Sequence, residues 1–273
     1  MMSHRSLLWL CGLAVAACSG APPRDVSNVS LSSTQARVAL NTHAITEVQP
    51  TERVLELLQA PDRLAEDRAL DQHKQAAELL TFLGVSPGMR VAELGCGGGY
   101  TTELLARAVG ATGTVYGQNA NLHDASIEHA WAARLARPAN AHVVRVDRNY
   151  SAPLPEQARG LDLVYLAVDY RSIPMGVDAD AMNHAVHLAL RRGGRYVVLD
   201  RTPPEGARLA DLRALHTQES RGTRRQIEAA GFSFVSEGRF FRDARDPRDW
   251  DAVPGEKRTG EKPDRFVLVF ERR

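Results

Sequence analysis

Apolar positions along the chain follow two spacings, one typical of helices and one typical of buried strands. A stripe at helical spacing runs through Asp71–Leu83 and ends at the turn Gly84-Val85-Ser86-Pro87-Gly88. Short, nearly continuous apolar runs, of which Leu161–Val168 is the clearest, have the length of strands buried on both faces. From residue 90 onward the two kinds of segment alternate.

This alternation predicts an α/β fold. We expect strands at Arg90–Leu94, Thr114–Gly117, His142–Val146, Leu161–Val168, Arg195–Leu199, Phe232–Phe240 and Phe266–Phe270. We expect helices at Thr51–Ala60, Asp71–Leu83, Thr101–Val109, Asp124–Ala136, Ala179–Leu190 and within Ala207–Ala230. Strands joined by helices form a parallel sheet covered on both faces, and the last two strands can pair antiparallel because no helix separates them. The prediction is a doubly wound, mostly parallel seven-stranded sheet with an antiparallel last strand.

The first residues differ from the rest of the chain. The apolar run Leu7–Ala17 follows Arg5, is too short to span a membrane, and ends in small residues before Cys18. This order resembles a bacterial lipoprotein signal, in which the cysteine becomes the lipidated first residue. The resemblance implies a signal peptide at residues 1–17 and a lipid anchor at Cys18, and a chance cysteine in a plain cleaved signal is the alternative. Ser19 resembles the residue found in lipoproteins sorted to an outer membrane.

Composition and charge indicate how the chain is divided into domains and which partners it can have. Residues 18–50 are polar with little periodicity, which predicts a flexible tether, and 51–273 are expected to form one domain, with 51–84 as N-terminal helices. A net charge of +1 gives no reason to expect a nucleic-acid partner. Cys96 would be the remaining cysteine of the mature chain, so no intrachain disulfide is expected. The resemblance to a lipoprotein signal implies a protein of the cell envelope that is membrane-anchored and faces the periplasm, whereas a chain without a working signal would be cytoplasmic.

A glycine-rich turn carries the strongest functional signal. The strand Val91–Leu94 leads into Gly95-Cys96-Gly97-Gly98-Gly99, and a helix is expected to begin near Thr101. Glycines allow positive φ and close approach of the backbone to a ligand, and the helix N-terminus supplies N–H groups and a positive dipole end. Such a turn suits a nucleoside-type cofactor, although a tight turn without a ligand has the same local pattern.

The spacing Glu93-x-Gly95-x-Gly97-x-Gly99 resembles the first motif of class I S-adenosylmethionine-dependent methyltransferases, which have a Rossmann-like fold. Further matches to that family are Asp147 after the third strand, Leu161–Tyr165 in the fourth, Leu190–Arg195 before the fifth and Glu228–Phe232 before the sixth. Gly113–Asn119 and Asp264–Leu268 resemble a bacterial group of methyltransferases. The cofactor contacts that the resemblance implies are Glu93, Gly95, Cys96, Gly97, Gly99, Gln118, Asn119 and Asp147.

One position departs from the family pattern. The family usually has Asp or Glu at the end of the second strand to bind the ribose hydroxyls, whereas this chain has Gln118, followed by Asn119 and Asn121. An amide can still hydrogen-bond a ribose, but without the assistance of charge.

Candidates for the chemistry follow the fourth strand. Asp169 and Tyr170 are our catalytic candidates, because this fold places substrate-facing residues there, although both can be plain loop residues. We expect no metal: His184 and His187 lack a third ligand, and a Mg²⁺ site at Asp169 and Asp200 would be a minor alternative.

The sequence is compatible with three functions, which it does not favour equally. The resemblance implies a methyltransferase that uses S-adenosyl-L-methionine and a small-molecule acceptor. A membrane-tethered binding protein without turnover is the alternative, because an exported protein meets little of a cytoplasmic cofactor. A nicotinamide-dependent oxidoreductase is disfavoured, since G-x-G-x-x-G spacing and an acidic residue after the second strand are both missing.

Overall fold

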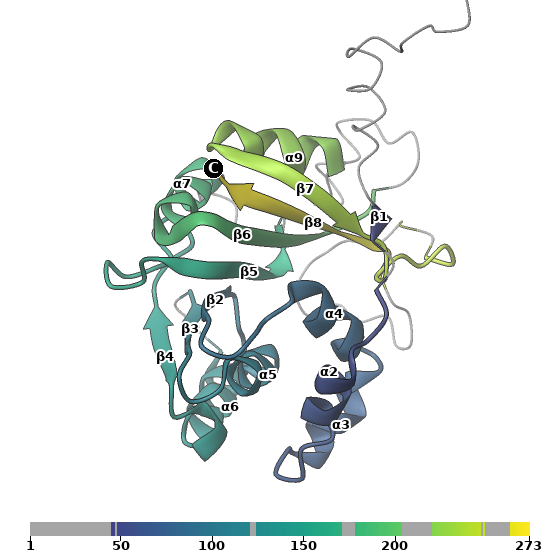
Figure 1. Ribbon diagram of the computed structural model, residues 1–273, viewed down its shortest axis with the longest axis vertical. Coiled ribbons are helices and arrows are strands. Elements are labelled where there is room, and N and C mark those ends of the chain that lie inside the picture. The colour runs from purple at the N-terminus through teal and green to yellow at the C-terminus, as the bar shows by residue number, and fades with distance from the viewer. Residues whose placement is uncertain are drawn as a thin grey trace, which may run out of the picture. The chain divides into compact units, whose positions relative to one another are not determined.

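The computed structural model describes residues 45–46, 48–120, 124–170, 178–203, 220–246, 248 and 263–273. The helices are α2 (Glu52–Leu58), α3 (Ala65–Asp71), α4 (Ala76–Leu83), α5 (Tyr100–Val109), α6 (Ala125–Leu135), the 3-10 turn η1 (Pro138–Asn140), α7 (Ala179–Ala189) and α9 (Ser220–Ala229). The strands are β1 (Ile45–Thr46), β2 (Arg90–Leu94), β3 (Thr114–Asn119), β4 (Val143–Asp147), β5 (Leu161–Asp169), β6 (Leu190–Arg201), β7 (Phe232–Gly238) and β8 (Arg265–Arg272). Figure 1 shows their arrangement.

The strands form one sheet in the order β1-β7-β8-β6-β5-β2-β3-β4. Neighbours pair in parallel except for β8, which runs antiparallel to both β6 and β7. The predicted doubly wound, mostly parallel sheet with an antiparallel last strand is therefore confirmed. The two-residue β1 adds an outer strand beside β7. It lies within residues 18–50, the segment predicted to be a tether.

Each face of the sheet has its own hydrophobic core. On one face α7 and α9 contribute Met182 and Ile227, which pack over strand residues such as Val164. On the other face α2, α4 and α5 pack side chains such as Leu83 and Leu105 against the opposite side of the same sheet. Because consecutive residues of a strand point to opposite faces, helices on both sides explain why the strands read as continuous apolar runs.

The N-terminal helices differ from the prediction. The predicted helix over Asp71–Leu83 forms only over Ala76–Leu83 as α4, and the sequence does not predict α3, which ends at Asp71. Gln75, directly before α4, has a left-handed φ of 48°, which ends the helical path. Its side-chain amide donates to the carbonyl oxygen of Phe240, so a long-range contact holds the unfavourable backbone conformation.

The strand ends also differ from the prediction. β6 begins at Leu190, before the pair Gly193-Gly194 that predicts a turn, and its register against β5 shifts between Leu161 and Leu163. Gly193 has a φ of 72°. The glycine therefore permits an irregularity inside the strand and does not mark the start of the strand. The part of the predicted helix over residues 207–219 lies outside the described residues.

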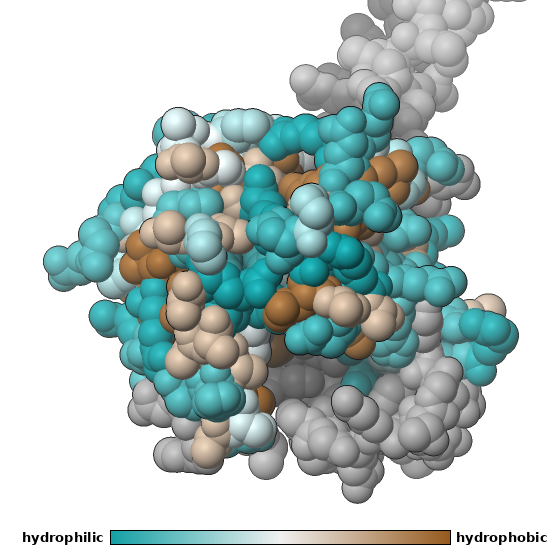
Figure 2. All heavy atoms as spheres, turned by 90° about the horizontal axis from the view of Figure 1, so that it is seen from below, coloured by the Kyte–Doolittle hydropathy of each residue, from teal (hydrophilic) through white to brown (hydrophobic). Residues whose placement is uncertain are grey.

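The described surface mixes polar and apolar side chains. On the face in Figure 2, hydrophobic residues lie in several separate patches between hydrophilic ones. Within the described ranges, no helix is both long and apolar enough to cross a membrane.

Candidate functional site

The glycine turn lies at the carboxyl end of β2 and leads directly into α5. The neighbouring strands β3 and β5 end on either side of it, where the chain changes the direction in which it adds strands. In open parallel sheets this switch point is where ligands bind. Gly99 is the N-cap of α5, so the first N–H groups of this helix, which helix geometry leaves without intrahelical acceptors, lie at the same place.

The three glycines of the motif serve different purposes. A Cβ atom on Gly95 would lie 2.6 Å from the Tyr150 hydroxyl, and one on Gly99 would overlap the ring of Trp131. These two glycines therefore permit close packing of side chains against the turn. Gly97 has a φ of 54°, and a Cβ atom there would meet nothing within 4 Å. Gly97 thus faces open space, which leaves room for a ligand beside its Cα atom.

Side-chain amides from the end of β3 hold the turn. The Gln118 side-chain oxygen accepts a hydrogen bond from the Gly95 N–H at 3.0 Å, and the Asn119 side-chain oxygen accepts one from the Gly97 N–H at 2.8 Å. Gln118 is fully buried and Asn119 nearly so. The structure therefore brings both predicted residues to the turn, where their amides bond to its backbone.

Glu93 lies one residue before the end of β2 and is almost completely buried. Burial raises the pKa of its carboxyl to about 7, against the hydrogen bond from the Thr102 hydroxyl and the positive charges of Lys74 and Arg134, which lower it. Glu93 is therefore poised between its neutral and charged forms near neutral pH. Glu93 lies two residues before Gly95 in the sequence, and its carboxyl bonds to Thr102, in the helix that follows the turn.

We expect Glu93→Gln to stabilise the ligand-free protein at pH 8. A carboxyl with a raised pKa contributes stability that is present below its ordinary value of 4.5 and is lost as the pH rises to about 7. The glutamine avoids this loss, which is on the order of 3 kcal/mol for a fully buried group. The free energy of unfolding of the variant should therefore exceed that of the natural chain at about pH 8 and differ little from it at about pH 4.5. Urea unfolding at both pH values measures the difference, and an equal effect at the two would contradict the prediction.

The thiol of Cys96 and the hydroxyl of Tyr150, both beside the turn, are protonated at neutral pH. Burial raises the pKa of the Cys96 thiol, and it raises the pKa of Tyr150 to about 12. A protonated thiol is a poor nucleophile, and a neutral phenol is a poor base. Cys96 is buried, and its backbone N–H donates to the Gln118 carbonyl oxygen, so the structure gives it a place within the turn.

The remaining predicted residues lie at the same edge of the sheet. Asp147 ends β4, opposite Asn119, and its exposed carboxylate pairs with Arg145 at 2.7 Å. Tyr170 is buried, and its hydroxyl accepts a hydrogen bond from the side-chain amide of Asn183 in α7 at 2.8 Å. The side chain of Asp169 lies outside the described part of the chain, as do Asn121 and Cys18. The catalytic roles of Asp169 and Tyr170 stay predictions.

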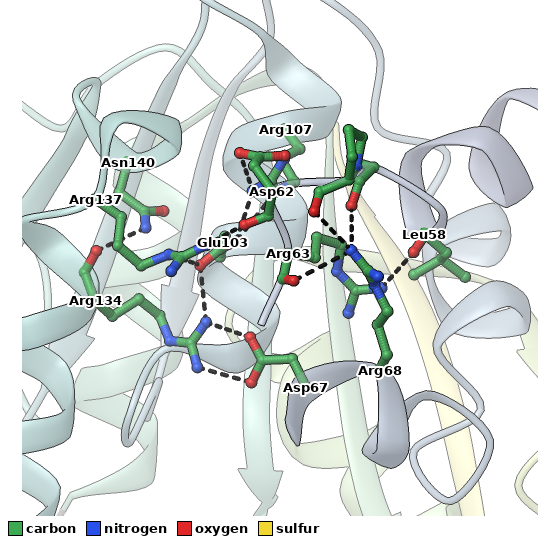
Figure 3. A network of polar contacts seen from close by, with 12 residues as sticks. Leu58, Asp62, Arg63, Asp67, Arg68, Glu103, Arg107, Arg134, Arg137 and Asn140 are labelled. Carbon is green, nitrogen blue, oxygen red and sulfur yellow. Dashed lines mark hydrogen bonds and ion pairs between the residues drawn. The ribbon is translucent and has the colours of Figure 1, made fainter. Parts of the chain in front are cut away.

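A network of ion pairs joins α3, α5 and α6 (Figure 3), and Arg134 connects this network to the turn. Arg134 of α6 donates to the Gly98 carbonyl oxygen at 2.8 Å, to both carboxylate oxygens of Asp67 in α3, and to Glu103 of α5. Glu103 also pairs with Arg107 and Arg137 and is almost completely buried. The network therefore connects three helices to one carbonyl group of the glycine turn.

A second link runs through α5. The hydroxyl of Tyr100, the first residue of that helix, donates to Asp71 of α3, which also pairs with Arg63. Lys74 lies 5.3 Å from the centre of the Tyr100 ring. The α3 helix therefore contacts Tyr100, the residue that directly follows the turn.

Sequence reasoning missed Tyr150, Trp131 and Arg134 as residues that shape the turn. None of them belongs to a short motif, and each reaches the turn from a distant part of the sequence. Thr102 left a weak signal, because a hydroxyl in the first turn of the helix after a glycine loop can reach back to the strand. No group of three or more His, Cys, Asp or Glu side chains in the described ranges could hold a metal ion.

Comparison with known proteins identifies the family. The model of the protein-L-isoaspartate(D-aspartate) O-methyltransferase (PCMT) family matches residues 53–199, which include the N-terminal helices, the glycine turn and strands β2 to β5. The chain belongs to the PCMT family. The family is one of S-adenosylmethionine-dependent methyltransferases, and the assignment of the glycine turn as the cofactor site stays a prediction.

Several other similar proteins are methyltransferases. The tRNA (adenine(58)-N(1))-methyltransferase TrmI of Thermus thermophilus is 48% identical over 50 residues, which are 18% of this chain and 20% of that protein. The chain therefore matches about a fifth of the length of these curated relatives. A solved methyltransferase from Mesorhizobium loti is 20% identical, with a TM-score of 0.51, over 74% of this chain and 100% of that one. One from Aquifex aeolicus is 13% identical, with the same score, over 79% and 96%.

Proposed function

We propose that this PCMT-family methyltransferase transfers a methyl group to a carboxylate on a small molecule or short peptide. Gly97 carries the cofactor part of this proposal, because it combines a positive φ with open space at the N-terminus of α5. S-adenosylmethionine fits such a site, since it needs close backbone approach and a counter-charge for its amino group. Glu93, with a pKa of about 7, would supply that charge. When bound, S-adenosylmethionine supplies an electrophilic methyl group.

A carboxylate acceptor suits the chemistry of the described side chains. An amine or hydroxyl acceptor loses a proton during the reaction and benefits from a base, whereas a carboxylate is already an anion. Cys96 and Tyr150 are protonated at neutral pH, and the carboxyl of Glu93 is buried and bonded to Thr102. The protein would then act mainly by excluding water and orienting the acceptor. The family description, which names an O-methyltransferase of isoaspartate, supports the same class.

A methyl-transfer assay tests the proposal. Radioactive S-adenosylmethionine would be incubated with the protein and with a short isoaspartyl peptide, its aspartyl counterpart or a small dicarboxylate. Methyl esters release methanol at alkaline pH, so we expect a label that becomes volatile in base. A base-stable label would overturn the carboxylate acceptor. Calorimetric binding of the cofactor without transfer to any acceptor would favour the tethered binding protein.

We also propose that the protein is anchored in the bacterial envelope through a lipid on Cys18. The ordered sequence of apolar run, small residues and cysteine supports this proposal. Labelling of cells with radioactive palmitate tests it. We expect label on the natural chain and none on Cys18→Ala. Equal label on both chains, or a natural chain found in the cytoplasmic fraction, would contradict the anchor.

A further inference from the structure

The Asn119 side chain forms a paired contact with a single residue of the glycine turn. Its oxygen accepts from the Gly97 N–H at 2.8 Å, and its nitrogen donates to the Gly97 carbonyl oxygen at 3.0 Å. Asn119 is 2% exposed. An amide is the side-chain group that can accept and donate in this way at once, because it carries an oxygen acceptor beside a nitrogen donor.

Gln118 forms a matching contact one residue earlier. Its oxygen accepts from the Gly95 N–H, and its nitrogen donates to the carbonyl oxygen of Arg148, in the segment after β4. Its own backbone carbonyl accepts from Gly95 and Cys96. Both amides therefore use a donor and an acceptor within the protein, and Gln118 also links the turn to the segment after β4.

These contacts place the two amides in a positioning role. Gly97 has a left-handed φ, and a turn built on such residues needs bonds to its peptide groups to keep one shape. A buried amide that already bonds to both ends of a residue gains little by leaving it for a ribose hydroxyl. The Asn119 side chain, which holds the turn, is thus poorly suited to bind a ribose hydroxyl as well.

We infer that Asn119 is a positioning residue that clamps Gly97 and presets the glycine turn for the cofactor, rather than a residue that binds the ribose. The inference rests on the proposed cofactor site. It assigns to the amide at this position a task that a carboxylate cannot perform, because a carboxylate has no proton to donate to the Gly97 carbonyl oxygen.

The substitution Asn119→Asp separates the two roles by the sign of its effect. If Asn119 clamps Gly97, the carboxylate meets the Gly97 carbonyl oxygen without a proton between them. We then expect the melting temperature without cofactor to fall by roughly 5 °C and the affinity for S-adenosylmethionine to fall about tenfold at pH 8. If Asn119 bound the ribose, the added charge would strengthen binding. Calorimetry and thermal unfolding measure both quantities.

The pH dependence supplies a readout that a general packing defect would not give. A protonated carboxylic acid can donate to the Gly97 carbonyl oxygen, so the loss in melting temperature of Asn119→Asp relative to the natural chain should shrink between pH 8 and pH 5. A loss that is equal at both pH values would overturn the clamp.

Asn140→Asp is the matched control. Asn140 is 3% exposed, and its nitrogen donates to the Arg134 carbonyl oxygen at 2.8 Å, outside the turn. We expect this variant to lose stability but to bind the cofactor as tightly as the natural chain. Equal weakening of binding in both variants would overturn the inference. A natural chain that binds no S-adenosylmethionine would refute the proposed function, while the melting temperatures would still test the clamp.

Discussion

Replacing Gly97 with valine is expected to abolish cofactor binding while the chain remains folded. A Cβ atom at this position meets no protein atom within 4 Å, so a side chain there starts into open space rather than into the core. That space lies at the N-terminus of α5, where the cofactor would approach the backbone. We expect the affinity for S-adenosylmethionine to fall by at least about 100-fold, since a filled site excludes its ligand. Calorimetry measures the affinity, and circular dichroism confirms the fold.

Gly160→Val is the control for backbone strain. Gly160 has a φ of 65°, and a Cβ atom there likewise meets nothing within 4 Å. It lies directly before β5, at the opposite end of the strands from Gly97. Both valines therefore cost similar strain, roughly 1–2 kcal/mol, but only one lies at the proposed site. Loss of binding in both variants, or tight binding by Gly97→Val, would contradict the assignment.

The sequence is sufficient to predict the parallel strands and the turn between β2 and α5. Leu161–Val168 is apolar on both faces because helices cover both sides of the sheet, and this burial leaves a readable pattern. Gly95, Gly97 and Gly99 also leave a readable pattern, because each has a positive φ that few other residues adopt.

Contacts between distant segments leave no such pattern. The left-handed conformation of Gln75 is held by a hydrogen bond to the Phe240 carbonyl oxygen, so the sequence does not show that the helix predicted over Asp71–Leu83 starts only at Ala76. Gly99 and Gly117 both face the ring of Trp131, but the sequence does not show which aromatic residue fills that space. The roles of the two amides at the end of β3 depend on the register between β2 and β3, which brings them beside the turn.

Arg134→Met is expected to cause the largest loss of stability among single changes around the site. The guanidinium of Arg134 is largely buried between Asp67 and Glu103, whose side chains are 6% and 2% exposed. Removal of one partner from a buried ion pair leaves an uncompensated charge and typically costs about 3–5 kcal/mol. The carbonyl oxygen of Gly98 loses its donor as well, so the glycine turn loosens. We expect weaker cofactor binding together with the lost stability.

Two comparisons identify the mechanism of that loss. Arg191→Met breaks an exposed pair with Asp162 and should cost less than about 1 kcal/mol. Asp67→Asn removes the opposite charge, so the double variant Asp67→Asn/Arg134→Met should be less destabilised than the sum of the two single variants. Additive losses would show that the arginine acts through packing rather than through its charge.

The pH dependence of Arg134→Met should follow from Glu103. Burial favours the neutral acid, but Arg107, Arg137 and Arg134 outweigh it and hold the pKa of Glu103 below its ordinary value of 4.5. A lowered pKa gives stability that is present above 4.5 and is lost as the pH falls through the folded-state value. With one arginine removed, Arg134→Met should lose less stability than the natural chain when the pH falls from about 6 to about 3. Urea unfolding across this range measures the slope, and an unchanged slope would mean that Arg107 and Arg137 alone fix the charge of Glu103.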